Sequence, residues 1–528
     1  MTRWVMLADL ERCVGCQTCT AACRHANATS PAVQWRKVLD IESGTYPDVT
    51  RSFVPVGCQH CDEPPCMEVC PSTATRQRPD GIVTIDYELC IGCAYCVVAC
   101  PYQARFKVDA PGFAYGAVQL RSESAREDPH RLGVAQKCTF CVDRVNYGIG
   151  LGITPGVDPR ATPACVNSCI ADALHFGNLD DPDSNVSKLL REHRHFRMHE
   201  GLGTGPGFYY LHGRADGAVA LPQAAPISAL GSIRAKGVEP WLQSSWDWRA
   251  AANFMGGGAG AGLFLLAALA GLAGIPSDPL ALVALALVAA GLLCVGLEIG
   301  RPWRFLNVLL HPQQSWMTRE SIAGLAFFAL GLAAVWSGSR TMFAATALAG
   351  LGFLYCQARI LAAAKGIPAW RDPRIVPLII TTGLCEGAGL FLAAAVMVSP
   401  LEPMRTAAAA GLAVLAAVRG VVWRAYLDSL ESGGAPIRTL EVLRAFHLWF
   451  LLFGLLVPIV LIAAAFMTPG AGAALCVAAG SCAFAAGWAL KLVLITRAAY
   501  NQGFALAHLP VRGSGAAGPS VKPGWAMQ

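Results

Sequence analysis

Charged residues are scarce in this 528-residue sequence: Asp, Glu, Lys and Arg together make up 14% of it, whereas an ordinary soluble domain has about 25%. There is no run of basic residues, and the net charge is only +6. These absences exclude a simple cytosolic enzyme, a disordered protein and a nucleic-acid-binding protein. The hydrophobic content of 54% and the mean hydropathy of +0.44 indicate a membrane protein instead.

The beginning of the sequence also lacks a recognisable targeting segment. Residues 1–10 hold only a short apolar stretch, Asp9 and Glu11 end it, and no Arg-Arg pair stands nearby. We therefore expect the first domain to be in the cytosol, where structural disulfides are rare. Cysteines in that domain are expected to be metal ligands.

Cysteine divides the sequence into two parts of different character. Of the 21 cysteines, 16 lie in residues 1–213 and the other five in apolar residues 254–496, where they show no ligand spacing. The Gly-, Pro-, Ala- and Ser-rich stretch between the two parts is typical of an extended linker. We expect a cysteine-rich domain over 1–213, a linker over 214–250, a membrane domain over 251–500 and a tail over 501–528.

The sixteen cysteines form four sequence groups. Two groups have the spacing C-x2-C-x2-C-x3-C, one has C-x2-C-x4-C-x3-C, and one has C-x2-C-x23-C-x3-C. Thiolates two residues apart on a tight turn can hold neighbouring corners of an iron–sulfur cube, and the fourth cysteine of such a run ligates the other cluster of a pair. In the order of the spacings given, the groups are Cys13, Cys16, Cys19 and Cys23, then Cys90, Cys93, Cys96 and Cys100, then Cys58, Cys61, Cys66 and Cys70, and finally Cys138, Cys141, Cys165 and Cys169.

Two other uses of these cysteines remain open at this point. Structural zinc uses C-x2-C pairs separated by a longer stretch, and only the last group has that form. A disulfide framework would need an oxidising compartment. The other three groups favour iron–sulfur clusters.

Four such groups in this order resemble the four-cluster electron-transfer subunit of dimethyl sulfoxide reductase-type molybdoenzyme complexes. Flanking segments agree: KCTFCVDR at 137–144, PAC at 163–165, ALHFG at 173–177 and GLGTGPGFYYL at 201–211. The resemblance covers residues 1–213 and implies an α+β ferredoxin-like tandem domain with four [4Fe–4S] clusters. Cys93 is intact at the position where nitrate reductase relatives have tryptophan, and Ile170 replaces the usual proline after the last cysteine.

The resemblance also implies that the sequence groups exchange ligands to form four ligand sets. The first set is Cys13, Cys16, Cys19 and Cys169, and the second is Cys138, Cys141, Cys165 and Cys23. The third set is Cys58, Cys61, Cys66 and Cys100, and the fourth is Cys90, Cys93, Cys96 and Cys70.

Apolar segments of membrane-spanning length fill the second part of the sequence. Each is near the roughly 20 residues that a helix needs to cross the hydrocarbon core, and abundant Gly and Ala suit close helix packing. The sequence therefore predicts an all-α bundle of eight transmembrane helices. The eight segments are 254–274, 279–299, 321–338, 342–363, 375–398, 404–423, 446–467 and 472–495.

The positive charges predict the orientation in the membrane. Eighteen Lys and Arg residues lie on the side shared with the N-terminus, and two, Arg340 and Arg405, lie on the other side. By the positive-inside rule, both termini and the cysteine-rich domain should be cytoplasmic, in a multi-pass protein of the inner membrane.

The histidines argue against bound haem. A b-type haem needs two facing histidines within helices, and only His447 lies clearly inside a predicted span. His447 itself is either a packed, hydrogen-bonded histidine or part of a quinone pocket.

Residues 296–321 resemble the quinol-site region of the haem-free, eight-helix anchor subunit of the same complexes. Gly300, Arg304 and Glu320 match the family's positions, whereas Glu298 stands where the family has histidine. Glutamate can also bind a quinone hydroxyl, but its usual pKa of about 4.3 differs from about 6.5 for histidine. The alternative is that Glu298, Arg301 and Arg304 are interfacial charges that only fix orientation.

Three charged residues fall within other predicted spans. An acid at mid-membrane, such as Glu386, is costly and suggests a function, either on a proton route or in a pair with another helix. Lys491 and Arg419 are closer to predicted span ends and are expected to extend to the interface.

These features predict a redox subunit without a catalytic site of its own, since no nucleophile motif or nucleotide loop is present. It would link the quinone pool to a catalytic partner subunit, and by resemblance that partner holds a molybdenum bis-pterin cofactor. The cytoplasmic face favours sulfite oxidation with quinone as acceptor. The alternatives are a quinol-dependent reductase of an S- or N-oxide or polysulfide, a proton-translocating redox module, and a stand-alone quinone-linked reductase.

Overall fold

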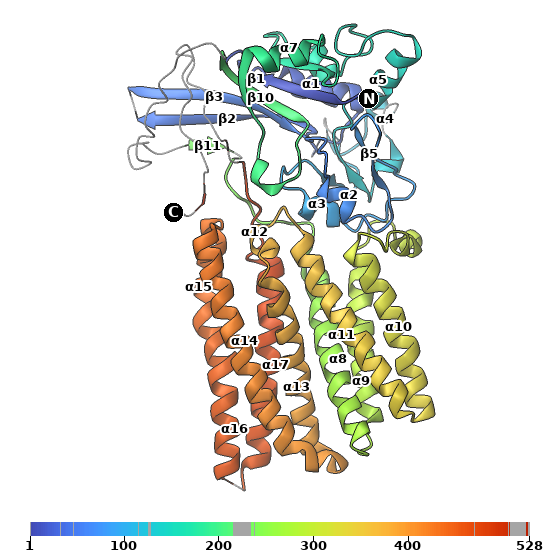
Figure 1. Ribbon diagram of the computed structural model, residues 1–528, viewed down its shortest axis with the longest axis vertical. Coiled ribbons are helices and arrows are strands. Elements are labelled where there is room, and N and C mark those ends of the chain that lie inside the picture. Colours follow the sequence, from blue (N-terminus) through green and yellow to red (C-terminus); the bar gives the residue numbers. More distant parts are fainter. Residues whose placement is uncertain are drawn as a thin grey trace. The chain divides into compact units, whose positions relative to one another are not determined.

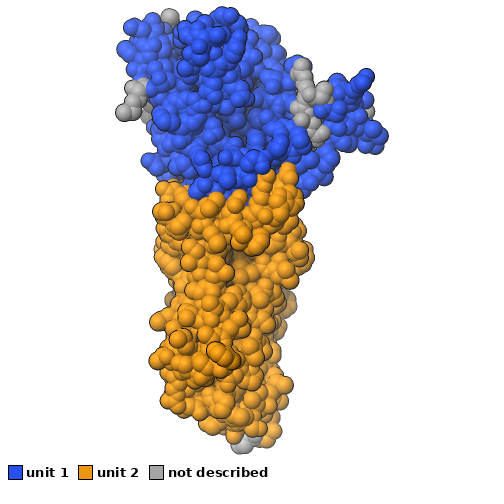
Figure 2. Space-filling model, turned by 90° about the vertical axis from the view of Figure 1, so that its right-hand side faces the viewer, with its two compact units in different colours: residues 1–241, 501–525 blue, residues 242–500, 526–528 orange. Residues whose placement is uncertain are grey.

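The computed structural model describes residues 2–31, 33–45, 47–113, 116–124, 128–214, 234–236, 238–468, 470–504, 506 and 524–525. The chain divides into two compact units, Met1–Trp241 with Asn501–Trp525, and Leu242–Tyr500 (Figure 2). Residues 215–233 of the predicted linker and residues 507–523 of the predicted tail lie outside the described part.

A four-stranded sheet organises the first unit. Its central strand β1 is a continuous apolar run, WVMLAD, buried along its whole length. Because alternate side chains point to opposite faces, Met6 packs into the main core with Phe176 and Phe208, whereas Leu7 packs on the other face with Val186. The strand order is β8 (Leu174–Asn178), β1 (Trp4–Asp9), β10 (Phe208–Arg214) and β9 (His193–Phe196), and only β1 and β10 are parallel.

Three smaller sheets and short helices complete this unit (Figure 1). The sheets are β2 (Arg36–Thr45) between β3 (Asp48–Gly57) and β11 (Arg234–Lys236), β4 (Thr75–Gln77) with β5 (Val83–Ile85), and β6 (Phe106–Lys107) with β7 (Ala135–Gln136). The α-helices are α1 (Thr18–Asn27), α2 (Pro65–Glu68), α3 (Tyr95–Ala99), α4 (Arg121–Ser124), α5 (Val142–Gly150), α6 (Ala164–Asn167) and α7 (Asn185–Glu192), and the 3₁₀ helices are Pro129–Arg131 and Glu200–Leu202.

The second unit is a helix bundle, and eight of its described segments are long and apolar enough to cross a membrane. The prediction of an α+β domain followed by an eight-helix bundle is therefore confirmed. The spanning segments are α8 (Trp248–Leu272), α9 (Asp278–Gly296), α10 (Trp316–Ser337), α11 (Arg340–Ala363), α13 (Ile375–Met397), η5 with α14 (Ser399–Met404 and Arg405–Gly433), α15 with a π-helix and α16 (Ile437–Leu451, Leu452–Leu456 and Val457–Met467), and α17 (Gly472–Thr496). Two short helices connect them, η4 (Pro302–Leu309) and α12 (Pro368–Arg371).

Glycine allows three of these helices to touch along their backbones. A Cβ added to Gly387 of α13 would lie 2.2 Å from the carbonyl carbon of Gly262 in α8. A Cβ added to Gly389 of α13 would lie 2.4 Å from the carbonyl oxygen of Gly480 in α17. Such contacts are the usual basis of helix packing where no water drives association.

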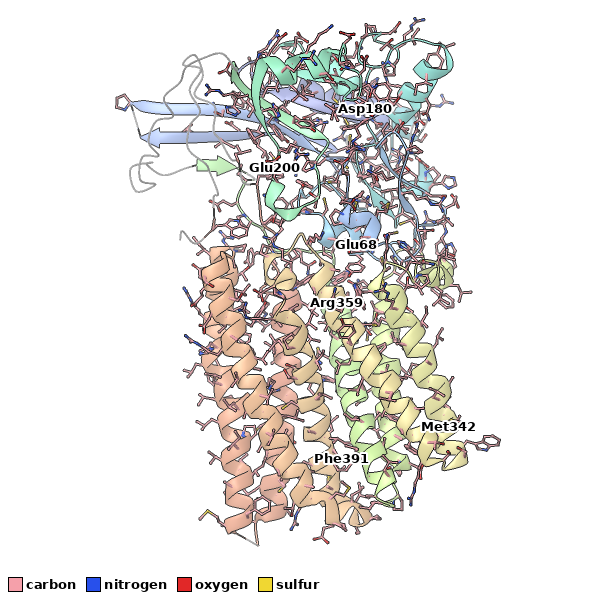
Figure 3. All side chains as sticks on the ribbon, in the orientation of Figure 1. Glu68, Asp180, Glu200, Met342, Arg359 and Phe391 are labelled. Carbon is pink, nitrogen blue, oxygen red and sulfur yellow. The ribbon has the colours of Figure 1, made fainter. Side chains whose placement is uncertain are left out.

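Three arginines of α10 and α11 can be assigned to the two ends of the bundle. Figure 3 shows Met342 and Arg359 at opposite ends of α11. Arg319, near the start of the antiparallel α10, lies at the Arg359 end, since both guanidinium groups stack on the Trp316 ring at 4.3 and 4.7 Å. Arg340 starts α11 at the other end.

Candidate iron–sulfur and quinone sites

The two cysteine groups of identical spacing have the same loop conformation. Gly15 and Gly92 occupy equivalent positions and have positive φ angles of 70° and 71°. Two residues further on, Gln17 and Ala94 are also left-handed, with φ angles of 63° and 58°, and α1 and α3 begin directly after them. Each loop thus turns tightly before its helix, and glycine permits this turn without the steric cost of a Cβ.

Cysteines distant in sequence meet around one cavity of the first unit. Cys169 belongs to the last sequence group, yet it lines the same cavity as Cys13, Cys16 and Cys19. The rest of the lining is mostly apolar, and the backbone N–H of Ala173 donates to Cys169 Sγ over 3.2 Å. The structure therefore brings together all four members of the first ligand set.

A second small cavity has the members of the fourth ligand set on its walls. Cys70 comes from a different sequence group, but it faces this cavity with Cys90, Cys93 and Cys96. At two places in the fold, therefore, a cysteine of another sequence group lies beside the first three cysteines of a group, as the family resemblance implies.

The thiols of the other two sets are also close neighbours. Burial raises the pKa of the Cys23 thiol, and the other three members of the second set raise it further. Burial likewise raises the pKa of Cys61, and the other three members of the third set add to the rise. The side-chain amide of Asn27 lies 3.7 Å from Cys23 Sγ and 3.8 Å from Cys141 Sγ. A donor so placed stabilises a thiolate that ligates a metal.

These surroundings suit iron–sulfur clusters better than single metal ions. Within the described residues, no three His, Cys, Asp or Glu side chains gather as ligands of one ion. A cubane holds its four cysteine sulfurs on separate corners, whereas a zinc ion draws them to a single centre. Small cavities lined by four thiols, with N–H donors to sulfur, therefore fit the clusters.

The predicted quinone residues lie near one end of the bundle but do not form one contact network. Glu298, just after α9, is 6% exposed and accepts a hydrogen bond from the backbone N–H of Asp247 over 3.2 Å. Gly300 lies just before η4 and Arg304 lies within it, and both are half-buried.

Glu320 lies in a separate polar network inside the bundle. It is 4% exposed, and its Oε1 accepts from Asn253 Nδ2 of α8 over 3.0 Å. Gln357 Nε2 of α11 donates to the Asn253 carbonyl over 2.9 Å. Three helices thus meet at one buried carboxylate, to which neither Glu298 nor Arg304 is bonded in the described structure.

His447 has a hydrogen-bonding partner within the bundle. Trp423 Nε1 donates to His447 Nδ1 over 2.9 Å, and the two rings are stacked with centroids 6.3 Å apart. This contact is that of a packed histidine and fixes its tautomer, because the accepting Nδ1 carries no proton.

Glu386 pairs with a lysine in the interior of the bundle. Lys491 Nζ lies 2.6 Å from Glu386 Oε2, and both side chains are fully buried. Lys491 also donates to the Phe254 carbonyl over 2.8 Å. The expectation that Lys491 extends to the interface is wrong, because its carboxylate and carbonyl partners lie inside.

Arg419 is likewise buried, contrary to expectation. Helix α14 continues to Gly433, beyond the apolar stretch, so that Arg419 lies in its middle. Its guanidinium donates to the carbonyls of Ala483 and Gly454. Pro458 has no N–H to bond the Gly454 carbonyl four residues earlier, and the helix has a π-turn there. The proline thus frees an acceptor that the arginine uses.

Comparison with known proteins agrees with both halves of the chain. A family model described as "4Fe-4S dicluster domain" matches residues 49–115, and one described as "Polysulphide reductase, NrfD" matches residues 241–495. The chain is 39% identical over 225 residues to a selenate reductase subunit of Mesobacillus selenatarsenatis, covering 40% of this chain and 72% of that protein.

Two further relatives match a similar share of the chain. A tetrathionate reductase subunit of Salmonella typhimurium is 38% identical over 214 residues, which is 40% of this chain and 72% of the relative. A sulfite dehydrogenase subunit of Allochromatium vinosum is 34% identical over 227 residues, which is 40% of this chain and 83% of the relative. The chain belongs to the iron–sulfur subunit family of dimethyl sulfoxide reductase-type molybdoenzyme complexes.

In this family member the iron–sulfur subunit is fused to its membrane anchor, since the dicluster model matches residues 49–115 and the NrfD model matches residues 241–495 of the same chain. The chain is therefore an electron-transfer and anchoring component of a molybdoenzyme complex. Sequence reasoning did not identify Asn253 and Gln357 beside Glu320, although polar residues within apolar spans were a usable signal.

Removing one partner of the Glu386–Lys491 pair should strongly destabilise the bundle. Lys491→Met leaves a buried carboxylate without its cation, and a lost partner of this kind costs about 3–5 kcal/mol. We expect Glu386→Gln together with Lys491→Met to recover part of that loss, as measured by thermal unfolding in detergent. Arg424→Met, which breaks an exposed pair with Asp428, is the control and should cost under about 1 kcal/mol. Equal losses of stability in Lys491→Met and in the control would contradict the prediction that the buried pair matters more than the exposed one.

Proposed function

We propose that this chain passes electrons between the membrane quinone pool and a catalytic subunit that holds a molybdenum bis-pterin cofactor. The observation that carries this proposal is the gathering of the first and fourth ligand sets around two separate cavities. When bound, iron–sulfur clusters supply one-electron transfer, and the protein's part is to hold them with thiolates and to shield them from water. Four [4Fe–4S] clusters, ligated by the four sets, are part of the proposal.

The quinone is proposed to bind near residues 296–321 of the membrane unit. Arg304 would bind a quinone oxygen, and Glu298 or the buried Glu320 would exchange its proton. Support comes from the resemblance of this segment to a quinol site and from the polar network that Glu320 makes with Asn253 and Gln357. A quinone role for His447 and for Glu386 is a weaker part of the proposal, because His447 is hydrogen-bonded to Trp423 and Glu386 is paired with Lys491. A haem is not part of the proposal.

The substrate of the catalytic partner is proposed to be sulfite, oxidised on the cytoplasmic side. The relative named as a sulfite dehydrogenase subunit supports this choice, as does the concentration of Lys and Arg on the side of the N-terminus. The reductive alternative, with quinol as donor, is supported by the more similar relatives named as selenate and tetrathionate reductase subunits. Proton translocation through the buried charges around Glu386 is a further alternative.

Iron content tests the ligand sets. The purified full-length protein should contain about sixteen iron atoms, four for each cubane. Cys169→Ser should lose the first cluster and leave the other three, because it removes a thiolate from one set only. Cys294→Ser, in a transmembrane helix, is the control and should retain all the iron. A content of about eight in the unaltered protein would refute the four sets.

Quinone kinetics test the membrane site. Glu320→Gln and Arg304→Met should slow quinone-linked electron transfer at least about tenfold, the effect of losing a single charged contact of about 1.4 kcal/mol. The iron content should stay unchanged. Arg301→Met is the matched control, because it removes a neighbouring charge to which the proposal assigns no contact with the quinone. If Arg301→Met slows the reaction as much as Arg304→Met, these arginines serve orientation only.

Protease accessibility tests the orientation. A protease added to intact spheroplasts should leave residues 1–213 uncut, and should cut them after the membrane is opened. Cleavage in intact spheroplasts would overturn the cytoplasmic placement.

Turnover by the purified complex tests the substrate and the direction. With the copurifying subunit present, sulfite should reduce a soluble quinone analogue, and no activity should remain when that subunit is removed. Quinol-driven reduction of tetrathionate, selenate or an S-oxide without sulfite oxidation would establish the alternative direction. Turnover by this chain alone would refute the need for a partner.

Turnover-linked proton movement into vesicles beyond that of quinone and substrate chemistry would support pumping.

A further inference from the structure

Three cationic side chains are buried in the first unit without any carboxylate partner. Arg36, Arg105 and Lys137 are 1%, 3% and 0% exposed. No Asp or Glu of the described structure forms an ion pair with any of them. A buried, uncompensated charge costs several kcal/mol, so three of them in one small unit require anions close by.

The hydrogen bonds of these cations are incomplete or go to neutral groups. Arg36 donates through Nη2 to Met6 Sδ over 2.9 Å, while its Nε and Nη1 have no acceptor within the described structure. Arg105 donates through Nη1 to Thr75 Oγ1 over 3.0 Å, while its Nε and Nη2 have none. Lys137 donates to the carbonyls of Val83 and Cys138. None of these acceptors carries a negative charge.

Two of the cations also oppose each other across a strand pair. The register of β6 and β7 pairs Phe106 with Gln136 and Lys107 with Ala135. Extending that register by one residue places Arg105 opposite Lys137. Like charges at opposite positions repel, and this repulsion is strong in a buried setting. The pair is stable only if negative charge surrounds it.

The thiols around each cation belong to two neighbouring ligand sets. Burial lowers the pKa of Arg36, and nearby thiolates more than offset this effect; they are Cys165, Cys138 and Cys23 of the second set and Cys19 of the first. Burial lowers the pKa of Lys137, and the thiolates that oppose this effect are Cys58 and Cys66 of the third set and Cys138 of the second. For Arg105 the corresponding thiolates are Cys66, Cys58 and Cys100 of the third set and Cys96 of the fourth.

Backbone neighbours agree with these positions. Arg36 begins β2, which packs against α1, and α1 carries Cys19 of the first set and Cys23 of the second. Lys137 immediately precedes Cys138 of the second set. Its side chain donates to the carbonyl of Val83, whose backbone N–H donates to His60, a residue between Cys58 and Cys61 of the third set. Thr75, the acceptor of Arg105, lines the cavity of the fourth set.

We propose that the three buried cations alternate with the four clusters, with Arg36 between the first and second, Lys137 between the second and third, and Arg105 between the third and fourth. This inference rests on the ligand sets of the proposed function. A cubane with four cysteine ligands is an anion that becomes more negative on reduction, so a fixed positive charge beside it raises its reduction potential. Each cation thus raises the potentials of two adjacent clusters together.

Redox titration followed by EPR spectroscopy tests the order. In the full-length protein, Arg36→Met, Lys137→Met and Arg105→Met should each lower two of the four cluster potentials most. The pairs of clusters affected by the three variants should overlap in one definite order. Arg36→Met and Lys137→Met share one cluster, Lys137→Met and Arg105→Met share one other, and Arg36→Met and Arg105→Met share none. This pattern identifies the order without prior assignment of any signal.

Charge-retaining and exposed variants are the controls. Arg36→Lys keeps the charge and should leave the potentials close to their original values. Arg51→Met removes an exposed arginine of β3 that is paired with Asp40 and should change none of them. Potentials that shift equally at all four clusters, or in pairs without this overlap, would overturn the proposal.

Iron analysis separates this proposal from the proposed function. If the unaltered protein lacks about sixteen iron atoms, the ligand sets fail and the order of cations fails with them. If the iron is present and the overlap is absent, only the order of cations fails. If Arg36→Met does not assemble clusters, Arg36→Lys decides. Assembly in Arg36→Lys supports the need for charge, and failure there shows that shape alone is required and refutes the proposal.

Discussion

Charge compensation inside a low-dielectric interior is the constraint on which the rest of this structure depends. Sixteen thiols are gathered within one α+β unit, and burial alone disfavours their ionised form. The sheet, the hairpins and the cysteine loops bring thiols from different sequence groups to shared cavities. The same elements bring Arg36, Arg105 and Lys137 to thiols of two different sets. The buried cations and the thiolates therefore compensate each other's charge, whereas either kind alone would destabilise the unit.

The membrane unit meets the same constraint with different groups. Glu386 and Lys491 neutralise each other, and Arg419 binds carbonyls instead of a carboxylate. Pro458 makes one of those carbonyls available by removing a helical N–H. Glycine contacts bring α8, α13 and α17 close together, and α13 and α17 carry the ion pair. Burying such a pair carries a high desolvation cost.

The sequence predicted the features that have a strong local pattern. Cysteine spacing indicated the sequence groups, and apolar length indicated eight spans, because each signal lies within a short stretch. Helix ends were less predictable, since α14 continues through Arg424 and Asp428 after its apolar stretch ends. The buried positions of Lys491 and Arg419 could not be predicted from the sequence either, because their partners come from other helices. Arg36, Arg105 and Lys137 look like ordinary surface residues until tertiary contacts place them among thiols.

Fusion of the two parts in one chain changes how they are kept together. The relatives align with 40% of this chain, and the membrane domain occupies a separate match over residues 241–495. A single chain fixes the two parts at a ratio of one to one and gives each a high effective concentration for the other. Binding energy between separate subunits is then unnecessary to keep the two parts together. For that reason, the variants that remove single buried charges should alter potentials and stability without releasing one part from the other.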